Sequence, residues 1–589
     1  MSDETNDISK ALAIVPPIEV EVVEDYADAA WESSTESAAS PDDGHDGHDG
    51  YDGSAGTTPK RPGRSSAPVL PTGQKLLMEM MMLMEGLEVR LGEYFGKRIV
   101  QVKINDRAGT RWVASESRDL SDFIRAKTYD CLSYGPGMDR VKAVVEHIEA
   151  KALNLPSMPM ATRHLMVDGV LYVGRGPGSG EAIAIDGSGY RLVADPPVIF
   201  VNGPYAGTLP VPEPGGDAEL LRGYFPNLEH QDWVSMLGFM VACFTPAGGF
   251  PVLLVHGPAN TGKSTLTDVL KRILDPVVGF GARTALPTKP EDLMNIACQR
   301  HLVSFDNISY VSGEMSDALC GLATGSSIET RTLYAQGSTT AVMARCPIIL
   351  NGITIGNLRP DLASRCVRIE TRPIPEDADS DDGSLFARLE RDLPKILGFL
   401  FSAVSMAIRD RRGTKVTPSH RLRDAATMAT AAEPELGLKD GEILTAWLQG
   451  QANIREDVAG VDPVVEMFTQ MLNRIGPGGQ ITGSASTIFQ KVISHENIFT
   501  TKRPPGFPDT AQKLAQHFSR YSDVLHAAGL KVNLSRTSKE RTWTISLKPT
   551  SATATETVTV TRPNRQAIVL ATEIDAAADA VKGAHTPAA

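Results

Sequence analysis

VLLVHGPANTGKSTLTDVL, residues 252–270, is the stretch that decides the fold of this chain. Its first four residues form an uninterrupted apolar run, which is typical of a strand buried on both faces of a parallel sheet. The run breaks at Gly257, and from there the sequence fits the pattern G-x-x-x-x-G-K-[ST], with Gly262, Lys263 and Ser264 at the fixed positions. Apolar residues then recur at the spacing of one helix face, beginning at Leu266. A strand before and a helix after are the context that a phosphate-binding loop requires.

The chemistry of this loop predicts that the chain binds ATP together with Mg²⁺. Glycines let successive backbone N–H groups converge on phosphates, and the following helix adds the positive end of its dipole. Lys263 supplies a point charge to the terminal phosphates, and the Ser264 hydroxyl is a magnesium ligand. The residues expected to contact the nucleotide are Gly257, Pro258, Ala259, Asn260, Thr261, Gly262, Lys263, Ser264 and Thr265.

A second apolar run, HLVSFDN at residues 301–307, ends in an acid about forty residues after Lys263. In phosphate-loop ATPases such an aspartate holds magnesium, so we expect Asp306 to be catalytic and to share the metal with Ser264. Asn307 stands where many of these enzymes have a glutamate that activates water. An amide orients a water but accepts its proton poorly, so hydrolysis is slow or another carboxylate, Glu291 or Glu314, replaces it.

A third apolar run, CPIILNG at residues 346–352, ends in Asn351, which we expect to sense the γ-phosphate and position water. The segment RPDLASR follows at residues 359–365. An arginine at this place, Arg365 above all, can reach the nucleotide of a neighbouring subunit as a finger. The alternative for either arginine is a surface ion pair with Asp361 or Glu370.

Residues 328–334 and 339–344 alternate between apolar and polar side chains around a turn that contains Gly337, which predicts a hairpin. In ring helicases a hairpin before the sensor strand grips single-stranded DNA. Arg331 and Tyr334 offer a phosphate contact and a stacking face for this purpose.

Composition limits the class of protein. Residues 1–58 contain fifteen acidic residues and one lysine, so the net charge of −13 comes from this tail and does not exclude nucleic acid as a partner. Residues 1–73 are therefore expected to be a disordered acidic tail. We find no apolar run long enough to span a membrane and no secretory signal. Six scattered cysteines without a C-x-x-C pattern are expected to be free thiols, as in a cytoplasmic protein.

The remaining chain is expected to form five further segments. Residues 74–215 form an α+β domain that begins with a helix over 76–95 and whose role stays open; residues 216–410 form the ATPase core. Residues 411–480 are helical, 481–548 form a small basic domain, and 549–589 form a disordered tail.

The basic domain holds ten Lys/Arg against four Asp/Glu. A helix capped by Asp509, followed by a hairpin with a basic loop, is the order of a winged helix-turn-helix that binds duplex DNA. The alternative is a solvated basic face used for protein contacts. The expected phosphate contacts are Lys513, Arg520, Arg536, Lys539 and Arg541.

Taken together, GPANTGKST, LVSFDN, SDALCGLATGSSIETRTLY, PIILNGI and RPDLASR resemble the superfamily 3 helicases, and in particular the primase-associated, poxvirus-type helicase-like ATPases of phages and integrated elements. The resemblance implies an α/β phosphate-loop NTPase with an AAA+-like core. It also implies a homo-oligomeric ring that acts on DNA during replication in the cytoplasm of a bacterial host, with a primase or another replication protein as a possible partner. The primase half of longer relatives is not recognisable.

Two other functions remain open at this stage. The first is a nucleotide-switched DNA-binding scaffold with slow hydrolysis and no unwinding, which Asn307 and the thinly basic hairpin favour. The second is a small-molecule kinase, against which the sensor strand, the downstream arginines and the basic domain all speak.

Overall fold

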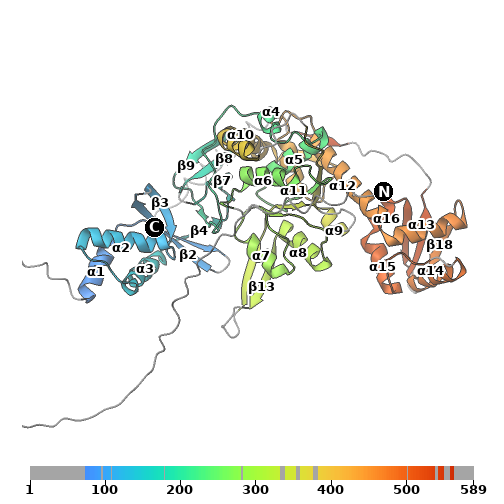
Figure 1. Ribbon diagram of the computed structural model, residues 1–589, viewed down its shortest axis with the longest axis horizontal. Coiled ribbons are helices and arrows are strands. Elements are labelled where there is room, and N and C mark those ends of the chain that lie inside the picture. Colours follow the sequence, from blue (N-terminus) through green and yellow to red (C-terminus); the bar gives the residue numbers. More distant parts are fainter. Residues whose placement is uncertain are drawn as a thin grey trace, which may run out of the picture. The chain divides into compact units, whose positions relative to one another are not determined.

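The computed structural model describes residues 73–94, 97–107, 109–177, 179–279, 283–331, 339–352, 358–375, 382–499, 502–536, 541–548 and 558–562. All of them belong to the second of the chain's two compact units, Leu70–Ala589. Figure 1 shows the helices and strands along the chain. The fold is mixed α/β. The predicted acidic tail lies outside the described residues, apart from Gly73.

A four-stranded parallel sheet organises the central part of the chain. It consists of β11 (Val252–His256), β12 (Val303–Phe305), β15 (Ile348–Asn351) and β16 (Cys366–Glu370), in the order β12-β15-β11-β16. All neighbouring strands run parallel, with Val255 opposite both Asn351 and Ile369. The three apolar runs are therefore strands of one parallel sheet, as their composition predicted. Their carboxyl ends meet at one edge, where Gly257, Asp306 and Gly352 follow them.

Both faces of this sheet are covered by helices, because successive residues of a strand point to opposite sides. Leu253 and Val255 belong to a large core that includes α5 (His230–Ala242), α6 (Lys263–Leu274), α10 (Asp382–Asp410), α11 (Arg423–Ala431) and α12 (Glu442–Gly460). Val252 and Leu254 face a second core with α7 (Pro290–Ala297) and α8 (Gly313–Thr324). Each fully buried Val or Leu side chain contributes about 1.5–3 kcal/mol, so burial on both faces fixes the strands that carry the loop.

The N-terminal region contains a separate sheet with the order β3-β2-β1-β4. Its elements are α1 (Gly73–Met84), β1 (Val89–Tyr94), β2 (Lys97–Asp106), β3 (Gly109–Ala114), α2 (Arg118–Leu132), α3 (Met138–Ala152) and β4 (Ser157–Met158). The helix predicted over 76–95 was wrong in its second half, where β1 pairs with β2. A turn at Glu85 and Gly86 ends the helix, and Val89 and Leu91 then alternate with polar residues, which is the period of a strand.

A second sheet from the predicted N-terminal domain shares its core with helices that cover the central parallel sheet. It has the order β6-β7-β8-β9, formed by His164–Val167, Val170–Gly174, Ala182–Asp186 and Gly189–Val193. Ile183 and Ile185 are fully buried in the same core as α10, and the Ser405 hydroxyl of α10 donates to the Asp186 carbonyl at 2.6 Å. The short elements β5 (Met160–Ala161), β10 (Ile199–Phe200) and α4 (Ala218–Arg222) connect these parts.

The hairpin predicted before the sensor strand is present. β13 (Ser326–Arg331) pairs antiparallel with β14 (Thr339–Ala344). Tyr334 and the side chain of Arg331 lie outside the described residues, so the expected DNA contact stays a prediction.

The C-terminal domain combines a three-stranded antiparallel sheet, β18-β20-β19, with four helices. Its elements are α13 (Pro463–Ile475), β18 (Gln480–Gly483), α14 (Ala485–Phe499), α15 (Ala511–Arg520), α16 (Ser522–Ala527), β19 (Leu530–Arg536) and β20 (Arg541–Leu547). The helix that was expected to begin at Asp509 is two helices broken at Tyr521, and its cap is Thr510, whose hydroxyl accepts from the Lys513 N–H. Asp509 instead pairs with the Lys513 ammonium at 2.9 Å. The strand β18 was not predicted.

A short strand lies within the stretch that was expected to be a disordered tail. β21 (Thr559–Thr561) pairs with β17 (Lys415–Thr417), and Arg562 forms ion pairs with Glu433 and Asp440. The pairing and the buried carboxylate of Glu433 explain why these few residues are ordered despite their Thr-rich composition. None of the helices in the described ranges has the length and apolarity needed to cross a bilayer.

Candidate functional site

The loop between β11 and α6 has the backbone shape that its glycines predict. Gly257 has φ +147° and Gly262 has φ +69°, a region that residues with a side chain rarely occupy. A Cβ on Gly257 would lie 2.4 Å from the Thr371 hydroxyl, so no other residue fits there. Asn260 also adopts positive φ, at +60°. The loop curls between the strand and the N-terminus of α6, the arrangement in which backbone N–H groups surround an anion.

Residues far away in the sequence hold this loop in place. The Asn227 amide donates to the Thr261 carbonyl at 2.6 Å, and the hydroxyls of Thr261 and Thr371 are 2.6 Å apart. The Thr371 N–H in turn donates to the His256 carbonyl at 2.8 Å. Sequence reasoning missed Asn227 and Thr371, because nothing in their local sequence marks them as partners of the loop.

Lys263, Ser264 and Asp306 meet at the carboxyl edge of the sheet. The Lys263 ammonium bends back over the loop and donates to the carbonyls of Gly257 (3.0 Å) and Pro258 (2.5 Å). The Ser264 hydroxyl donates to Asp306 Oδ2 at 3.1 Å. A hydroxyl and a carboxylate oxygen side by side are ligands that Mg²⁺ prefers, so these two residues fit the predicted metal.

Asn351 is fully buried at the tip of β15, beside the loop strand. Neither its amide nitrogen nor its amide oxygen has a hydrogen-bond partner among the described residues. Leaving such a group unpaired costs about 1–3 kcal/mol, which is typical of a position kept for a ligand. The Asn351 carbonyl accepts from the Ile308 N–H at 3.1 Å, so the end of β15 contacts the segment that carries Asp306.

Asn307 is exposed and has left-handed backbone geometry, with φ +55°. Its N–H donates to Asp306 Oδ1 at 2.9 Å, and its Cα packs against Gly352. The carboxylates considered as replacements, Glu291 and Glu314, lie exposed in the first turns of α7 and α8.

Two charged residues that sequence reasoning missed surround the acid. Arg283 contacts Asp306 through Nη1 and donates through Nε to Asp268 Oδ1 at 2.8 Å. Asp268 stands one helical turn after Ser264 on α6. These residues line a cavity of about 770 Å³ together with Asn307. No motif marks Arg283, and the only signal in the sequence is a positive charge in the connection between α6 and α7.

The arginines after β15 lie around the short helix α9 (Pro360–Ala363). Arg365 donates to the Asp361 carbonyl at 2.6 Å, and its buried Nε has no partner among the described residues. Arg359 pairs with Asp317 at 2.9 Å rather than with Asp361 or Glu370, the partners considered from the sequence.

The candidate DNA contacts of the C-terminal domain divide into two groups. Arg536 and Arg541 face each other across the end of the β19–β20 hairpin and are exposed, whereas Lys539 lies outside the described residues. Lys513 pairs with Asp509. Arg520 contacts Asp317 and Asp361 of the central region at 3.4 and 3.3 Å, so it joins the C-terminal domain to the segment that carries Arg365.

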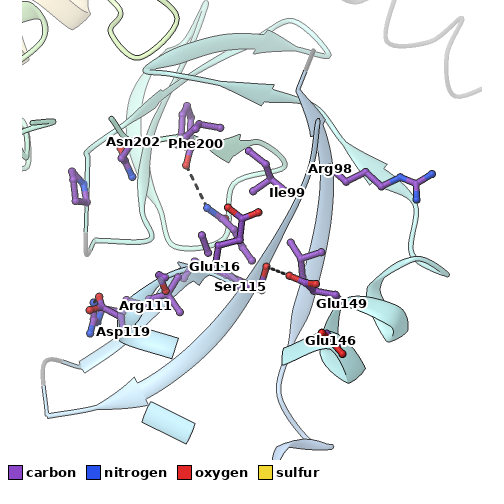
Figure 2. A pocket seen from close by; sticks show the side chains of 18 of the residues that line it. Arg98, Ile99, Arg111, Ser115, Glu116, Asp119, Glu146, Glu149, Phe200 and Asn202 are labelled. Carbon is purple, nitrogen blue, oxygen red and sulfur yellow. Dashed lines mark hydrogen bonds and ion pairs between the residues drawn. The ribbon is translucent and has the colours of Figure 1, made fainter. Parts of the chain in front are cut away.

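The N-terminal region has a cavity of its own, of about 820 Å³, where β3 leads into α2 (Figure 2). The Ser115 hydroxyl donates to Glu149 at 2.6 Å on one side, and the Phe200 carbonyl accepts from the Gln101 amide at 3.4 Å on the other. Arg111 in its wall is bonded to Asp106 and Asp119. The charged groups of this cavity thus satisfy one another in part.

Comparisons with known proteins bear on the middle of the chain. Residues 224–449, less than half of the chain, match the family described as actinomycete integrative conjugative element replication protein. No curated protein matches the sequence. Solved structures of the C-terminal region of NrS-1 in its apo form resemble the chain at 11% identity and a TM-score of 0.35, covering 81% of this chain and all of that one. A structure described as the A form of that region gives 12% identity and a TM-score of 0.35, covering 80% of this chain and 99% of that one. Over the matched stretch, which contains the loop, Asp306 and Asn351, the chain is similar to a replication protein of a mobile genetic element.

Proposed function

We propose that this protein is an ATP-driven DNA motor that works in the replication of a mobile element. In this proposal residues 257–265 bind ATP, and hydrolysis there drives movement on DNA. The domain formed by α13–α16 and β18–β20 is a winged helix that binds duplex DNA.

One observation supports the nucleotide site above all others. Three polar groups converge at one edge of the sheet. They are a hydroxyl from the loop after β11, a carboxylate at the end of β12, and an unpartnered buried amide at the end of β15, the strand between those two. Ser264, Asp306 and Asn351 are those groups, and Lys263 covers the loop beside them. A buried amide without partners is costly in an empty structural core, and it is useful where a phosphate oxygen or a water binds.

Each residue has a distinct task in this proposal. The loop N–H groups and Lys263 bind the phosphates, Ser264 and Asp306 hold magnesium, and Asn351 orients the water that attacks the γ-phosphate. Magnesium, when bound, supplies positive charge to the phosphate oxygens. Arg365 reaches the site of a neighbouring subunit in a homo-oligomeric ring.

DNA enters the proposal at two places. Single-stranded DNA binds at the β13–β14 hairpin, and duplex DNA binds at the basic end of the β19–β20 hairpin. Arg536 and Arg541 are exposed directly opposite each other, where they can neutralise phosphates on one backbone. Arg520 would carry a signal between the DNA-binding domain and the core, because it is paired with Asp361.

A second function deserves a test because of Asn307. An exposed amide at this position cannot accept the proton of the attacking water. The protein would then be a scaffold that binds DNA in its ATP state and hydrolyses ATP slowly without unwinding.

The deciding experiment measures ATP hydrolysis by the purified protein with and without single-stranded DNA. Lys263→Ala is the variant without the loop charge, and Lys439→Ala, an exposed lysine elsewhere, is the matched control. Strong stimulation by DNA that is lost only in Lys263→Ala supports the motor. Weak turnover that DNA does not change supports the scaffold.

Duplex DNA binding is measured on the same variants. Lys263→Ala is expected to retain it, and Arg536→Ala combined with Arg541→Ala is expected to lose it. Equal loss of hydrolysis and duplex binding in folded Lys263→Ala would contradict two separable sites.

A further inference from the structure

Arg283 is fixed beside the metal-binding acid by its own backbone. The next residue, Thr284, forms a parallel bridge with Phe305 at the open edge of the central sheet. The Thr284 N–H donates to the Ser304 carbonyl and the Thr284 carbonyl accepts from the Asp306 N–H, both at 3.1 Å. The segment thus extends the sheet by one residue pair. Arg283 therefore starts from a defined position next to Asp306.

The guanidinium of Arg283 bridges two carboxylates. Its Nε bonds to Asp268 Oδ1, and its Nη1 contacts Asp306 Oδ2. The same Oδ2 accepts the Ser264 hydroxyl, whereas Oδ1 of Asp306 accepts the Asn307 N–H. Arg283 therefore contacts the same carboxylate oxygen, Asp306 Oδ2, that accepts the hydrogen bond from the Ser264 hydroxyl.

In this geometry Arg283 and a metal ion would compete for the same oxygen, Asp306 Oδ2. The Asp306 side chain is only 12% exposed, and a carboxylate so poorly hydrated needs a nearby positive charge. The Arg283 guanidinium supplies that charge in this structure. A divalent cation bound at Asp306 would supply it instead, and two cations at the same oxygen would repel each other.

We propose that Arg283 is a positioning residue that holds Asp306 Oδ2 until magnesium and nucleotide arrive, and that Asp268 retains the displaced guanidinium at the site. The inference rests on the proposed nucleotide site and adds a residue that neither the loop motif nor the matched family description identifies. It has two consequences. Arg283 favours nucleotide without metal, because it neutralises Asp306 beside the polyphosphate. It also raises the magnesium concentration that the site requires, because the metal must displace it.

The experiment measures binding of fluorescently labelled ATP to the full chain, first in EDTA and then across a magnesium titration. Arg283→Gln keeps the length of the side chain and removes its charge. Arg283→Lys keeps the charge but cannot bridge both carboxylates. Arg272→Gln is the matched control, because Arg272 lines the same cavity and pairs with Glu390 instead.

Arg283→Gln is expected to weaken metal-free ATP binding about tenfold, the effect of one uncompensated charge near the polyphosphate. Its magnesium half-saturation is expected to fall severalfold, whereas Arg283→Lys and Arg272→Gln remain close to the wild type. The decisive comparison uses Asp306→Asn. Once Asp306 is neutral, adding Arg283→Gln is expected to leave metal-free binding unchanged.

Two results would overturn the inference. A loss of metal-free binding that persists in the Asp306→Asn background means that Arg283 acts on the nucleotide directly. An unchanged magnesium titration in folded Arg283→Gln means that it does not compete with metal. Both leave the nucleotide site intact, whereas a wild type that binds no ATP even with magnesium overturns the proposed function and this inference together.

Discussion

Replacing Asp275 by Asn should destabilise the core strongly, because Asp275 pairs with two buried cations. Asp275 follows α6, and its carboxylate binds two buried cations, Arg163 at 3.0 Å and Lys271 at 2.7 Å. It also accepts the N–H groups of His301 and Leu302, both at 3.1 Å. These two residues immediately precede β12. The network thus joins the helix that carries the loop to the strand that carries Asp306.

The magnitude follows from what the substitution leaves behind. The side chains of Arg163 and Lys271 are 2% and 1% exposed, so neither cation can recover its hydration when the anion is removed. Burial already lowers the pKa of Lys271 below its ordinary value. Breaking a buried pair by neutralising one partner costs about 3–5 kcal/mol. We expect a loss of that size from the free energy of unfolding.

Urea unfolding followed by tryptophan fluorescence and circular dichroism measures this loss. Asp509→Asn is the control, because its pair with Lys513 is exposed on both sides, and it should leave the urea midpoint unchanged. Adding Lys271→Met to Asp275→Asn should restore part of the stability, because it removes one of the two buried cations that lose their anionic partner. A loss below about 1 kcal/mol for Asp275→Asn, a quarter of the expected value, would refute the argument that these charges depend on Asp275.

Three further predictions concern pH, the loop and the C-terminal strand. Burial lowers the pKa of His301 to about 4. Between pH 6.5 and 4 the unfolded chain therefore binds more protons than the folded chain does. The free energy of unfolding should fall by up to about 3 kcal/mol as the pH is lowered through that range. His301→Gln should flatten this pH dependence, measured by denaturation curves. Gly257→Ala should reduce ATP affinity more than about tenfold and also lower the melting temperature, measured by titration and calorimetry, because its Cβ would collide with Thr371. Burial raises the pKa of Glu433 to about 7, and Arg562 opposes that shift. Arg562→Met should therefore cost about 1–3 kcal/mol at pH 8 and less at pH 6, where Glu433 is protonated; equal losses at both pH values would contradict this.

The parts of the site that the sequence predicted are those encoded by short, contiguous patterns. A buried strand, a glycine-bearing turn and an amphipathic helix occur together in residues 252–273, and the strands that end at Asp306 and Asn351 are continuous apolar runs. Parallel strands bring their carboxyl ends to one edge, so the meeting of Ser264 with Asp306 followed from the pattern itself.

The residues that were missed depend on contacts between distant segments. Asn227 reaches Thr261 across 34 positions, and Thr371 reaches it across 110. Arg283 is positioned by the β-bridge between Thr284 and Phe305 of β12, and no periodic pattern in the sequence predicts this bridge. The helix error over 76–95 has a different cause. A Met- and Leu-rich helix is followed after a short turn by a strand that also carries apolar residues, Val89 and Leu91, and the change from a 3.6-residue to a 2-residue period separates the two elements.

The choice between motor and scaffold depends on the edge of the sheet that holds Asn307. The backbone of Asn307 is held in place, because its N–H donates to Asp306 and its Cα packs against Gly352. The exposed amide therefore cannot be exchanged for a carboxylate by a small shift of the chain. A proton acceptor for fast hydrolysis has to come from another element, and Glu291 and Glu314 stand on α7 and α8, which cover the sheet face beside this edge. If Glu291→Gln or Glu314→Gln lowers DNA-stimulated ATP hydrolysis without weakening ATP binding, that glutamate is the proton acceptor of the motor. If neither does and turnover is already slow, Asn307 makes the protein a switch whose ATP state persists on DNA.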